Sequence, residues 1–262
     1  MRGGFAGVLC GLAGLVLLTP HLVPDDPLRQ SLLLSLDPPS WQHPLGTDHL
    51  GRSVLARLAH GARRSFGLAL AATTIATAIG LGLGLIAAWR RGLTDIVIMR
   101  AADVALACPG LLIAVLLAGT LGGGVFAMLI GLQVAAVPPI LRMTRTVAVA
   151  ALASTAVETA VVSGHRLGYI VTRFVLPPVA RQVVTLATLG LGSAVLAISS
   201  LGFLGLGIDP PTPELGAMIA ELLPYIAEAP VQTLAPAVLI WLFVLAATVI
   251  GEHYSARWAD QR

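Results

Sequence analysis

Long apolar stretches alternate with polar connections along this chain of 262 residues. Five of them hold no charged residue and meet or approach the roughly 20 residues that a membrane-spanning helix needs. They are residues 3–24, 66–89, 104–141, 182–208 and 229–251. The third is too long for one crossing, and Gly122, Gly123 and Gly124 inside it indicate a tight turn. The pattern therefore predicts an all-α membrane protein with six transmembrane helices, the third and fourth being residues 104–121 and 125–141.

The polar connections divide the chain into parts. We expect an N-terminal transmembrane helix at 1–24, an extracytoplasmic connection at 25–65, a five-helix core at 66–251 and a tail at 252–262. Two connections inside the core are long, an inner one at 142–181 and an outer one at 207–230. The stretch 214–227 has apolar residues at helical spacing, so we expect a short helix lying at the outer membrane interface.

The arginines indicate the orientation. Cytoplasmic connections of membrane proteins are rich in basic residues. If both termini are cytoplasmic, 11 of the 16 arginines lie on inner segments, and eight of the 13 acidic residues lie on outer ones. This asymmetry favours two cytoplasmic termini. A cleavable signal peptide is the rival interpretation of the first stretch, but Thr19-Pro20-His21 is a poor cleavage site, so we expect an anchored helix.

Composition agrees with a bilayer environment and excludes several functions. The mean hydropathy is +0.89, and only 11% of the residues are charged, against about 25% in soluble domains. No lysine occurs, which excludes a phosphate-binding P-loop and Schiff-base chemistry. If ATP powers this protein, another chain binds it. The arginines are scattered rather than clustered, which argues against a nucleic-acid partner.

No catalytic or metal constellation is visible. The six histidines are dispersed, and neither HExxH nor GxSxG occurs. His43 and His49 flank Asp48 without a recognised ligand spacing, so we expect no metal site. Cys10 and Cys108 lie in apolar stretches without a CxxC pattern and are expected to pack rather than react.

Two further patterns concern helix packing. Arg100 and Asp103 lie at the expected cytoplasmic mouth of the third helix, where an interfacial ion pair is the interpretation we favour over a functional pair. The glycine series 80, 82, 84 and the pair 190, 192 predict close helix contacts.

The inner connection 142–181 is the most informative one. It holds Glu158-Thr159-Ala160, then Gly164, then Leu176-Pro177. A helix-compatible stretch between them ends at a proline that stops or kinks it. The residues alone indicate either a short helix-turn-helix that docks into a partner's groove, or an ordinary loop on the membrane.

These residues resemble the EAA loop of binding-protein-dependent ABC importers. That pattern has the three residues EAA, a glycine at the seventh place and a closing Leu-Pro; Glu158, Ala160, Gly164, Leu176 and Pro177 match it. Thr159 replaces the second alanine, and Phe174 stands where the pattern has isoleucine.

Two further motifs resemble the dipeptide, oligopeptide and nickel permeases of this class. The first comprises His43-Pro44-Leu45-Gly46-Thr47-Asp48, Gly51-Arg52, Val54-Leu55 and Gly61-Ala62-Arg63. The second is Phe203-Leu204-Gly205-Leu206-Gly207 with Pro210-Pro211-Thr212-Pro213. The resemblance spans residues 43–262, although the family's usual closing pattern is absent.

The resemblance implies a type I (MetI-like) ABC importer permease in the bacterial inner membrane. Such a permease is non-catalytic and binds no cofactor itself. It works beside a sister permease, usually non-identical, with two ATPase subunits that bind ATP and Mg and an extracytoplasmic substrate-binding protein. The EAA loop would couple to an ATPase, and the outer segments from His43 to Arg64 and from Ile208 to Pro230 would meet the binding protein.

The cargo stays open at this point. Di- or oligopeptides are the first expectation, and nickel, metal-chelator complexes, opines and glutathione are carried by relatives. A stand-alone channel or secondary transporter should show charges near mid-membrane or broken helices in paired repeats, and a membrane enzyme should show a polar constellation. The uncharged centres of the stretches argue against both.

Overall fold

The computed structural model describes residues 25–259. These residues form helices that are joined by loops. Its principal helices are α2 (Val54–Arg90), α3 (Gly92–Ala107), α4 (Gly110–Thr120), α5 (Gly124–Leu152), α6 (Thr155–Val162), α7 (Leu167–Ile170), α8 (Leu176–Phe203), α9 (Leu215–Leu222) and α10 (Pro230–Ala259). Short turns are η1 (Leu32–Leu34), the π-helical η2 (Val171–Val175) and η3 (Leu223–Tyr225). The expectation of an all-α protein is confirmed.

Within residues 25–259, four helical segments are long and apolar enough to cross a membrane. They are Val54–Arg90, Gly124–Leu152, Leu167–Phe203 and Pro230–Ala256. The pair α3 and α4 gives a fifth span if it is counted as one, although it bends by 90°. The expected first span, residues 3–24, lies outside the described residues, so the count is compatible with six.

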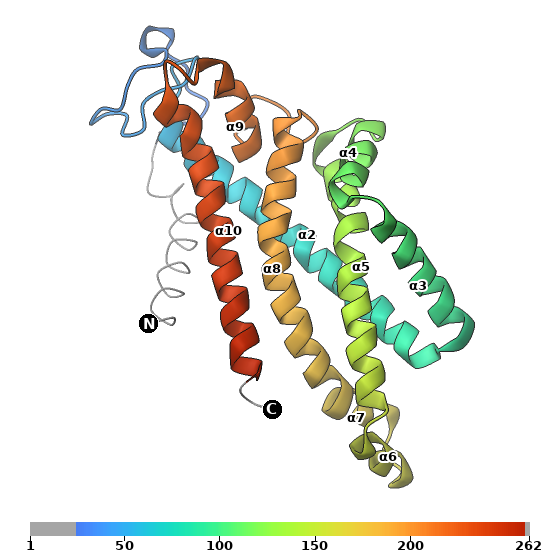
Figure 1. Ribbon diagram of the computed structural model, residues 1–262. Coiled ribbons are helices and arrows are strands. Elements are labelled where there is room, and N and C mark those ends of the chain that lie inside the picture. Colours follow the sequence, from blue (N-terminus) through green and yellow to red (C-terminus); the bar gives the residue numbers. More distant parts are fainter. Residues whose placement is uncertain (1–24, 260–262) are drawn as a thin grey trace.

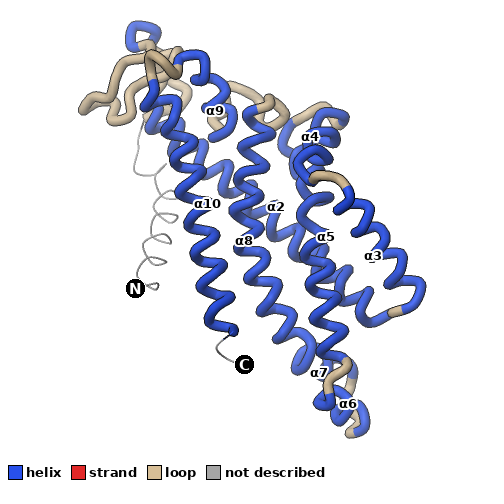
Figure 2. Tube along the Cα trace, viewed as in Figure 1, coloured by secondary structure: helices blue, strands red, loops and turns tan. Residues whose placement is uncertain are grey.

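The spans stand as a slanted bundle. In Figure 1, α10, α8 and α5 lie side by side while α2 crosses behind them, and the bent pair α3–α4 stands beside α5. Figure 2 shows the longest loops gathered at one end, with the segment 25–53 and α9. We call this the α9 end. The opposite α6 end carries α6, α7 and the junction of α2 with α3 (Figure 1).

The third span differs from the prediction. The stretch 104–121 is broken at Cys108 and Pro109, and α3 begins twelve residues earlier than expected, at Gly92. The residue before a proline is driven toward extended backbone, and Cys108 has φ −107° and ψ 148°. A long uncharged run therefore hides a sharp bend that one proline imposes.

Helix α2 also begins earlier than predicted, at Val54 instead of residue 66. The twelve additional residues include Arg57, His60, Arg63 and Arg64. These polar side chains favoured a connection over a membrane-spanning helix. Ala56, Ala59 and Ala62 nevertheless lie on a buried face, so packing of small residues continues the helix back to Val54.

Close contact between α2 and α5 rests on two of the predicted glycines. A methyl group on Gly80 would lie 2.8 Å from the side chain of Ile140, and one on Gly84 would lie 2.6 Å from that of Thr144. Gly82 and Gly190 face open space, so the close-packing prediction fails for these two. At the other end of the bundle, the rings of Phe66 and Phe243 stack at 3.8 Å and join α2 to α10.

The predicted outer helix exists, as α9 and η3, but it is inserted into the bundle and not laid on its surface. Leu215, Met218 and Leu222 are fully buried, and α9 lies between the upper parts of α8 and α10 (Figure 1). Gly216 lets the backbone of α9 approach α8, since a methyl group there would lie 1.8 Å from the carbonyl oxygen of Ser199.

Candidate functional site

The α6–α7 unit, residues 155–170, projects from the α6 end of the bundle (Figure 1). Its turn closes with two backbone hydrogen bonds: Gly164 donates to Val161 at 3.0 Å, and His165 donates to Ala160 at 3.1 Å. This pair of bonds is the Schellman arrangement that ends many helices at a left-handed residue. Gly164 supplies that residue, with φ +76°. The predicted helix-turn-helix is therefore present.

The unit has a small core of its own. Val157 and Ala160 pack against Ile170, with Phe174 alongside. The rings of His165 and Tyr169 stack at 4.5 Å across the turn. These contacts hold the turn in shape, although the unit is attached to the bundle mainly through α5 and the start of the next span.

The other side of the unit is exposed and partly apolar. Glu158 and Thr159 are exposed, and the exposed fractions of Val161 and Val162 are 58% and 84%. A methyl group on Gly164 would meet nothing within 4 Å. A valine pair beside a carboxylate on a projecting helix is a surface suited to a protein groove.

The closing Leu176 and Pro177 form the first residues of α8, and both are exposed. Because Pro177 and Pro178 have no N–H group, two carbonyl groups in the preceding turn lack their usual α-helical donors. The chain passes through the π-helical turn η2 at this place. The proline thus modifies the helix without stopping it, and a continuous span runs from Leu167 to Phe203.

At the α9 end, the motif around residue 48 forms a buried charge cluster of Asp48, Arg52, Arg57 and Glu221. The Asp48 carboxylate accepts hydrogen bonds from Nε of Arg52 at 2.6 Å and Nη1 of Arg57 at 2.5 Å. The same two guanidinium groups donate to Glu221 of α9 at 2.9 and 2.7 Å. The cluster therefore joins three parts of the chain: the segment 25–53, which holds Asp48 and Arg52, helix α2 and helix α9.

Burial and hydrogen bonding act in opposite directions on Asp48. Burial raises the pKa of its carboxyl, but the backbone N–H of Arg52 and the charges of Arg57 and Arg52 lower it more. The net result is a pKa below the usual value, so the Asp48 carboxyl is ionised near neutral pH.

Neighbouring motif residues fix the backbone of the connection. Gly46 and Gly51 have φ values of +72° and +69°, and a methyl group on Gly51 would lie 1.8 Å from the carbonyl oxygen of Ser31. The hydroxyl of Thr47 accepts a hydrogen bond from the N–H of Asp37 at 2.9 Å. Gln232 of α10 donates to the carbonyl of Asp37 at 3.0 Å, so the connection is anchored to a spanning helix as well.

Burial changes the interpretation of this motif as a partner surface. Six of the residues proposed for contact with a binding protein are buried inside the chain: Gly46, Thr47, Asp48, Gly51, Arg52 and Pro213. Their side chains serve the chain's own structure in this arrangement. His43 is half-buried, and Pro210 and Pro211 are exposed, so a contact through these three stays a prediction.

A metal ion does not fit the charge cluster. Ligand atoms of Asp48, His49 and Glu221 lie within 4.8 Å of one another, so the fold brings one predicted histidine to two carboxylates. Both carboxylates, however, already accept hydrogen bonds from Arg52 and Arg57. A cation would meet two adjacent guanidinium charges, and the ring of His49 instead stacks on Tyr225 at 5.5 Å.

A second buried carboxyl group at this end, that of Glu214, was not anticipated from the sequence. It caps α9 by accepting the N–H of Ala217 at 2.9 Å, and it accepts the hydroxyl of Ser65 at 2.8 Å. No arginine pairs with it among the described residues. Burial therefore raises the pKa of Glu214, in spite of these hydrogen bonds. An acidic residue directly before an apolar helix was the available signal.

We expect Glu214→Gln to stabilise the chain at pH 7–8. A carboxyl group with a raised folded-state pKa favours folding when it is protonated, and this advantage is lost as the pH rises through that pKa. Glutamine removes the charge. Its amide oxygen can still accept the N–H of Ala217, while its NH2 group donates to the hydroxyl oxygen of Ser65 in place of the second accepted hydrogen bond. The melting temperature at pH 8 should rise by about 2–4 °C, equivalent to roughly 1 kcal/mol, and by less at pH 5. Ser65→Ala is the control, because it removes a hydrogen bond without removing charge, and a lower melting temperature in Glu214→Gln would contradict the assignment.

The two ion pairs that join α3 to α5 were not anticipated from the sequence. Asp103 pairs with Arg142 and lies 3.5 Å from Arg100, and Asp95 pairs with Arg145. The expected ion pair of Arg100 with Asp103 is present, its place at the membrane interface stays a prediction, and a second partner of Asp103, Arg142, comes from α5. Residues 39 and 50 positions apart give no local sequence signal for such pairs.

Comparison with known proteins places the chain in a family. Residues 80–260 match the family described as binding-protein-dependent transport system inner membrane component. The chain is 36% identical to the di/tripeptide transport system permease protein DppC of Pseudomonas aeruginosa over 259 residues, which cover 96% of this chain and 86% of the relative. It is 30% identical to the dipeptide transport system permease protein DppC of Haemophilus influenzae, over 96% and 88% of the two chains.

A third relative has a different substrate in its name. The glutathione transport system permease protein GsiD of Escherichia coli O157:H7 is 36% identical over 214 residues, 82% of this chain and 71% of the relative. The match to the family covers more than half of the chain, including the α6–α7 unit and four of the spans. The chain belongs to the inner-membrane permease components of binding-protein-dependent transport systems.

Proposed function

We propose that this chain is one permease subunit of an ATP-driven importer of small peptides. The observation that carries the proposal is the 36% identity to a di/tripeptide permease over 96% of the chain. Glutathione, named for another relative, is itself a tripeptide, so it falls in the same class of cargo. The relatives compared above are named for peptides, and nickel, the earlier alternative, has no support from them.

The α6–α7 unit is the proposed contact with an ATPase subunit. Its support is the exposed valine pair, the exposed Glu158, and a turn whose outer side is empty at Gly164. A helix that presents apolar residues in this way fits a groove on a partner. Closure of two ATPase subunits would then move the unit and, through α5 and α8, the bundle as a rigid body.

The remaining partners follow from this assignment. ATP and Mg bind to the ATPase subunits, while this chain contributes no catalytic group and no cofactor site. A second, usually non-identical permease completes the path. Both termini and the α6 end face the cytoplasm, supported by the arginine asymmetry. An extracytoplasmic binding protein delivers the peptide at the α9 end, where His43, Pro210 and Pro211 are the proposed contacts.

The test replaces Gly164 with asparagine in the complete importer, reconstituted in proteoliposomes with its binding protein. Asparagine tolerates a positive φ better than other non-glycine residues, and the added side chain meets nothing in this chain. We expect dipeptide uptake to fall on the order of tenfold, the effect of losing about 1.4 kcal/mol of docking energy. The chain should still fold and insert.

Gly92→Asn is the matched control. Gly92 also has a positive φ, of +58°, also faces open space, and lies at the same end of the bundle, in the α2–α3 turn. Its substitution should leave uptake unchanged. Equal uptake by Gly164→Asn and the native importer, with all subunits assembled, would show that the α6–α7 unit does not dock into the ATPase.

A further inference from the structure

A cavity lies at the α6 end, between the end of α2 and the segment 167–175 that follows the α6–α7 turn. The cavity measures about 390 Å³, within the range of roughly 300–1,000 Å³ typical of pockets that hold small ligands. Its walls come from the end of α2, the start of α3, the last turns of α5, and α7 with η2. The lining residues are Leu85, Ile86, Ala88, Trp89, Arg90, Thr94, Ala148, Leu152, Leu167, Val171 and Val175.

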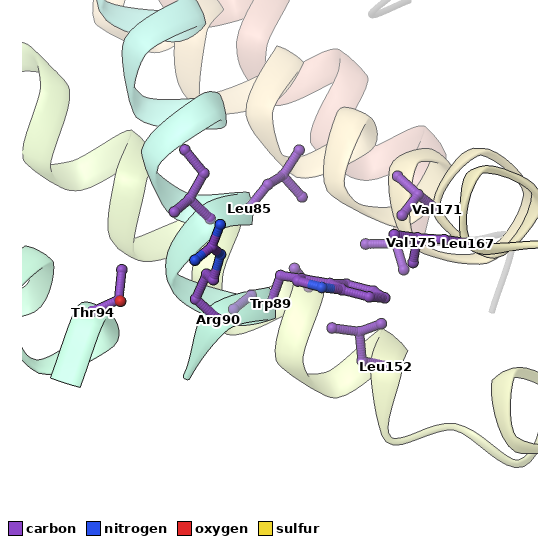
Figure 3. A pocket seen from close by; sticks show the side chains of 11 residues that line it. Leu85, Trp89, Arg90, Thr94, Leu152, Leu167, Val171 and Val175 are labelled. Atoms are coloured by element: carbon purple, nitrogen blue, oxygen red, sulfur yellow. The ribbon is translucent and has the colours of Figure 1, made fainter. Parts of the chain in front are cut away.

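The walls are apolar apart from the guanidinium group of Arg90, the hydroxyl of Thr94 and the indole N–H of Trp89. Figure 3 shows the ring of Trp89 between Leu152 and the pair Val171 and Val175, with Arg90 and Thr94 on the other side of Trp89. Trp89 is 46% exposed. A half-exposed tryptophan at the end of a spanning helix is typical of the membrane interface, so the cavity opens at headgroup depth.

The charge at the rim is uncompensated. Arg90 and the adjoining Arg91 are exposed, and neither has an acidic partner among the described residues. The nearest acidic position along the chain, Asp95, is paired with Arg145. Two free guanidinium groups beside an apolar cavity complement a molecule with one anionic head and an apolar body.

We propose that this cavity binds an anionic phospholipid of the inner leaflet, with an acyl chain between Trp89, Leu152 and Val175 and the phosphate at Arg90. The proposal uses the orientation given above but does not depend on the cargo. The lipid would touch Leu167, Val171 and Val175, which connect the α6–α7 unit to α8. Its site is therefore placed to link the end of α2 to the segment that carries the ATPase contact.

The experiment measures phospholipid retained by the purified complete importer, by native mass spectrometry, after exchange into phosphatidylglycerol or phosphatidylcholine. The native complex should retain phosphatidylglycerol at this site and bind phosphatidylcholine more weakly. Arg90→Gln should weaken phosphatidylglycerol binding about fivefold, the effect of one basic residue at an anionic membrane surface. Thr94→Trp should reduce occupancy by filling the cavity from an exposed position.

Two controls match these changes. Arg100→Gln removes an exposed arginine on α3, and Thr146→Trp adds the same bulk at an exposed site on α5; neither residue lines the cavity. Both should retain phospholipid as the native complex does. Equal retention by Arg90→Gln and its control would overturn the proposal. It would also fail if a photocrosslinker at position 94 labelled another subunit in place of lipid.

Because lipid occupancy is measured without transport, this result is separate from the test of the α6–α7 unit. Loss of lipid in Arg90→Gln with normal dipeptide uptake would support the site and show that the lipid is not required for transport.

Discussion

Replacing Asp48 with alanine should remove most of the folded protein from the membrane. The carboxylate is fully buried and shared by Arg52 and Arg57, whose side chains are 3% and 1% exposed. Its loss leaves two guanidinium groups facing each other with only Glu221 between them. Breaking a buried ion pair on one side costs about 3–5 kcal/mol, a large part of the 5–15 kcal/mol that stabilises a typical fold. The measurement is the yield of monodisperse chain in detergent and its melting temperature.

Asp209→Ala is the matched control, since Asp209 is an exposed aspartate at the same end of the bundle, and its yield should equal the native one. The native protein should also show the sign expected from the lowered pKa of Asp48. Stability from this group is complete above its ordinary pKa of 3.8 and is lost as the pH falls through the lower folded-state value. Near-native yield and melting temperature in Asp48→Ala would show that the cluster does not hold the connection to α9.

Gly216→Ala is expected to have the second largest effect. The added methyl group would lie 1.8 Å from the carbonyl oxygen of Ser199 and 2.6 Å from its carbonyl carbon, and backbone atoms cannot move aside as a side chain can. Helix α9 must shift away from α8, which opens the buried contacts of Leu215 and Met218. Overpacking of this kind costs typically 1–3 kcal/mol, so the melting temperature should fall by several degrees.

The control for Gly216 is Gly190→Ala in α8. Gly190 is helical and faces open space, and alanine is the better helix former by about 1 kcal/mol. This variant should be as stable as the native chain or slightly more stable. Equal melting temperatures for Gly216→Ala and Gly190→Ala would mean that α9 is not packed against α8 as described.

Much of the fold was predictable because a bilayer restricts what a backbone can do. An apolar run of about 20 residues must form a helix there, since no water is present to satisfy its N–H and C=O groups. The approximate places of the spans from α5 onward followed from this rule. The predicted inner connection 142–181 was too long, however, because α5 runs on to Leu152 and the next span begins at Leu167 instead of residue 182. The same rule gives no information on bends, so the 90° break at Pro109 was hidden within an uncharged stretch.

Helix ends were the less predictable part. Helix α2 begins as early as Val54 because alanines in its first three turns are buried against other parts of the chain. In addition, Arg57 forms ion pairs with Asp48 and Glu221. Taken alone, the arginines of this segment indicate a polar loop. Likewise, α5 runs past Arg142 and Arg145, whose charges are met by Asp103 and Asp95 from another helix.

The two motifs illustrate the difference between local and tertiary information. The turn of the α6–α7 unit could be expected from Gly164, because a left-handed residue ending a short helix is a local requirement. The role of Asp48, Gly51 and Arg52 could not. Their motif suggested a partner surface, whereas contacts with Ser31 in the same connection and with Glu221, far away in the chain, bury them.

The sequence by itself determined that this is a helical membrane protein, which residues form most of its spans, and where the α6–α7 turn lies. Those features depend on apolar length and on local backbone geometry. Only the tertiary structure decided that α9 is inserted between spans, that Asp48 and Glu221 share two arginines, and that a cavity opens beside Trp89 and Arg90. Each of these depends on side chains brought together from distant segments, whose attraction to one another leaves no periodic pattern in the sequence.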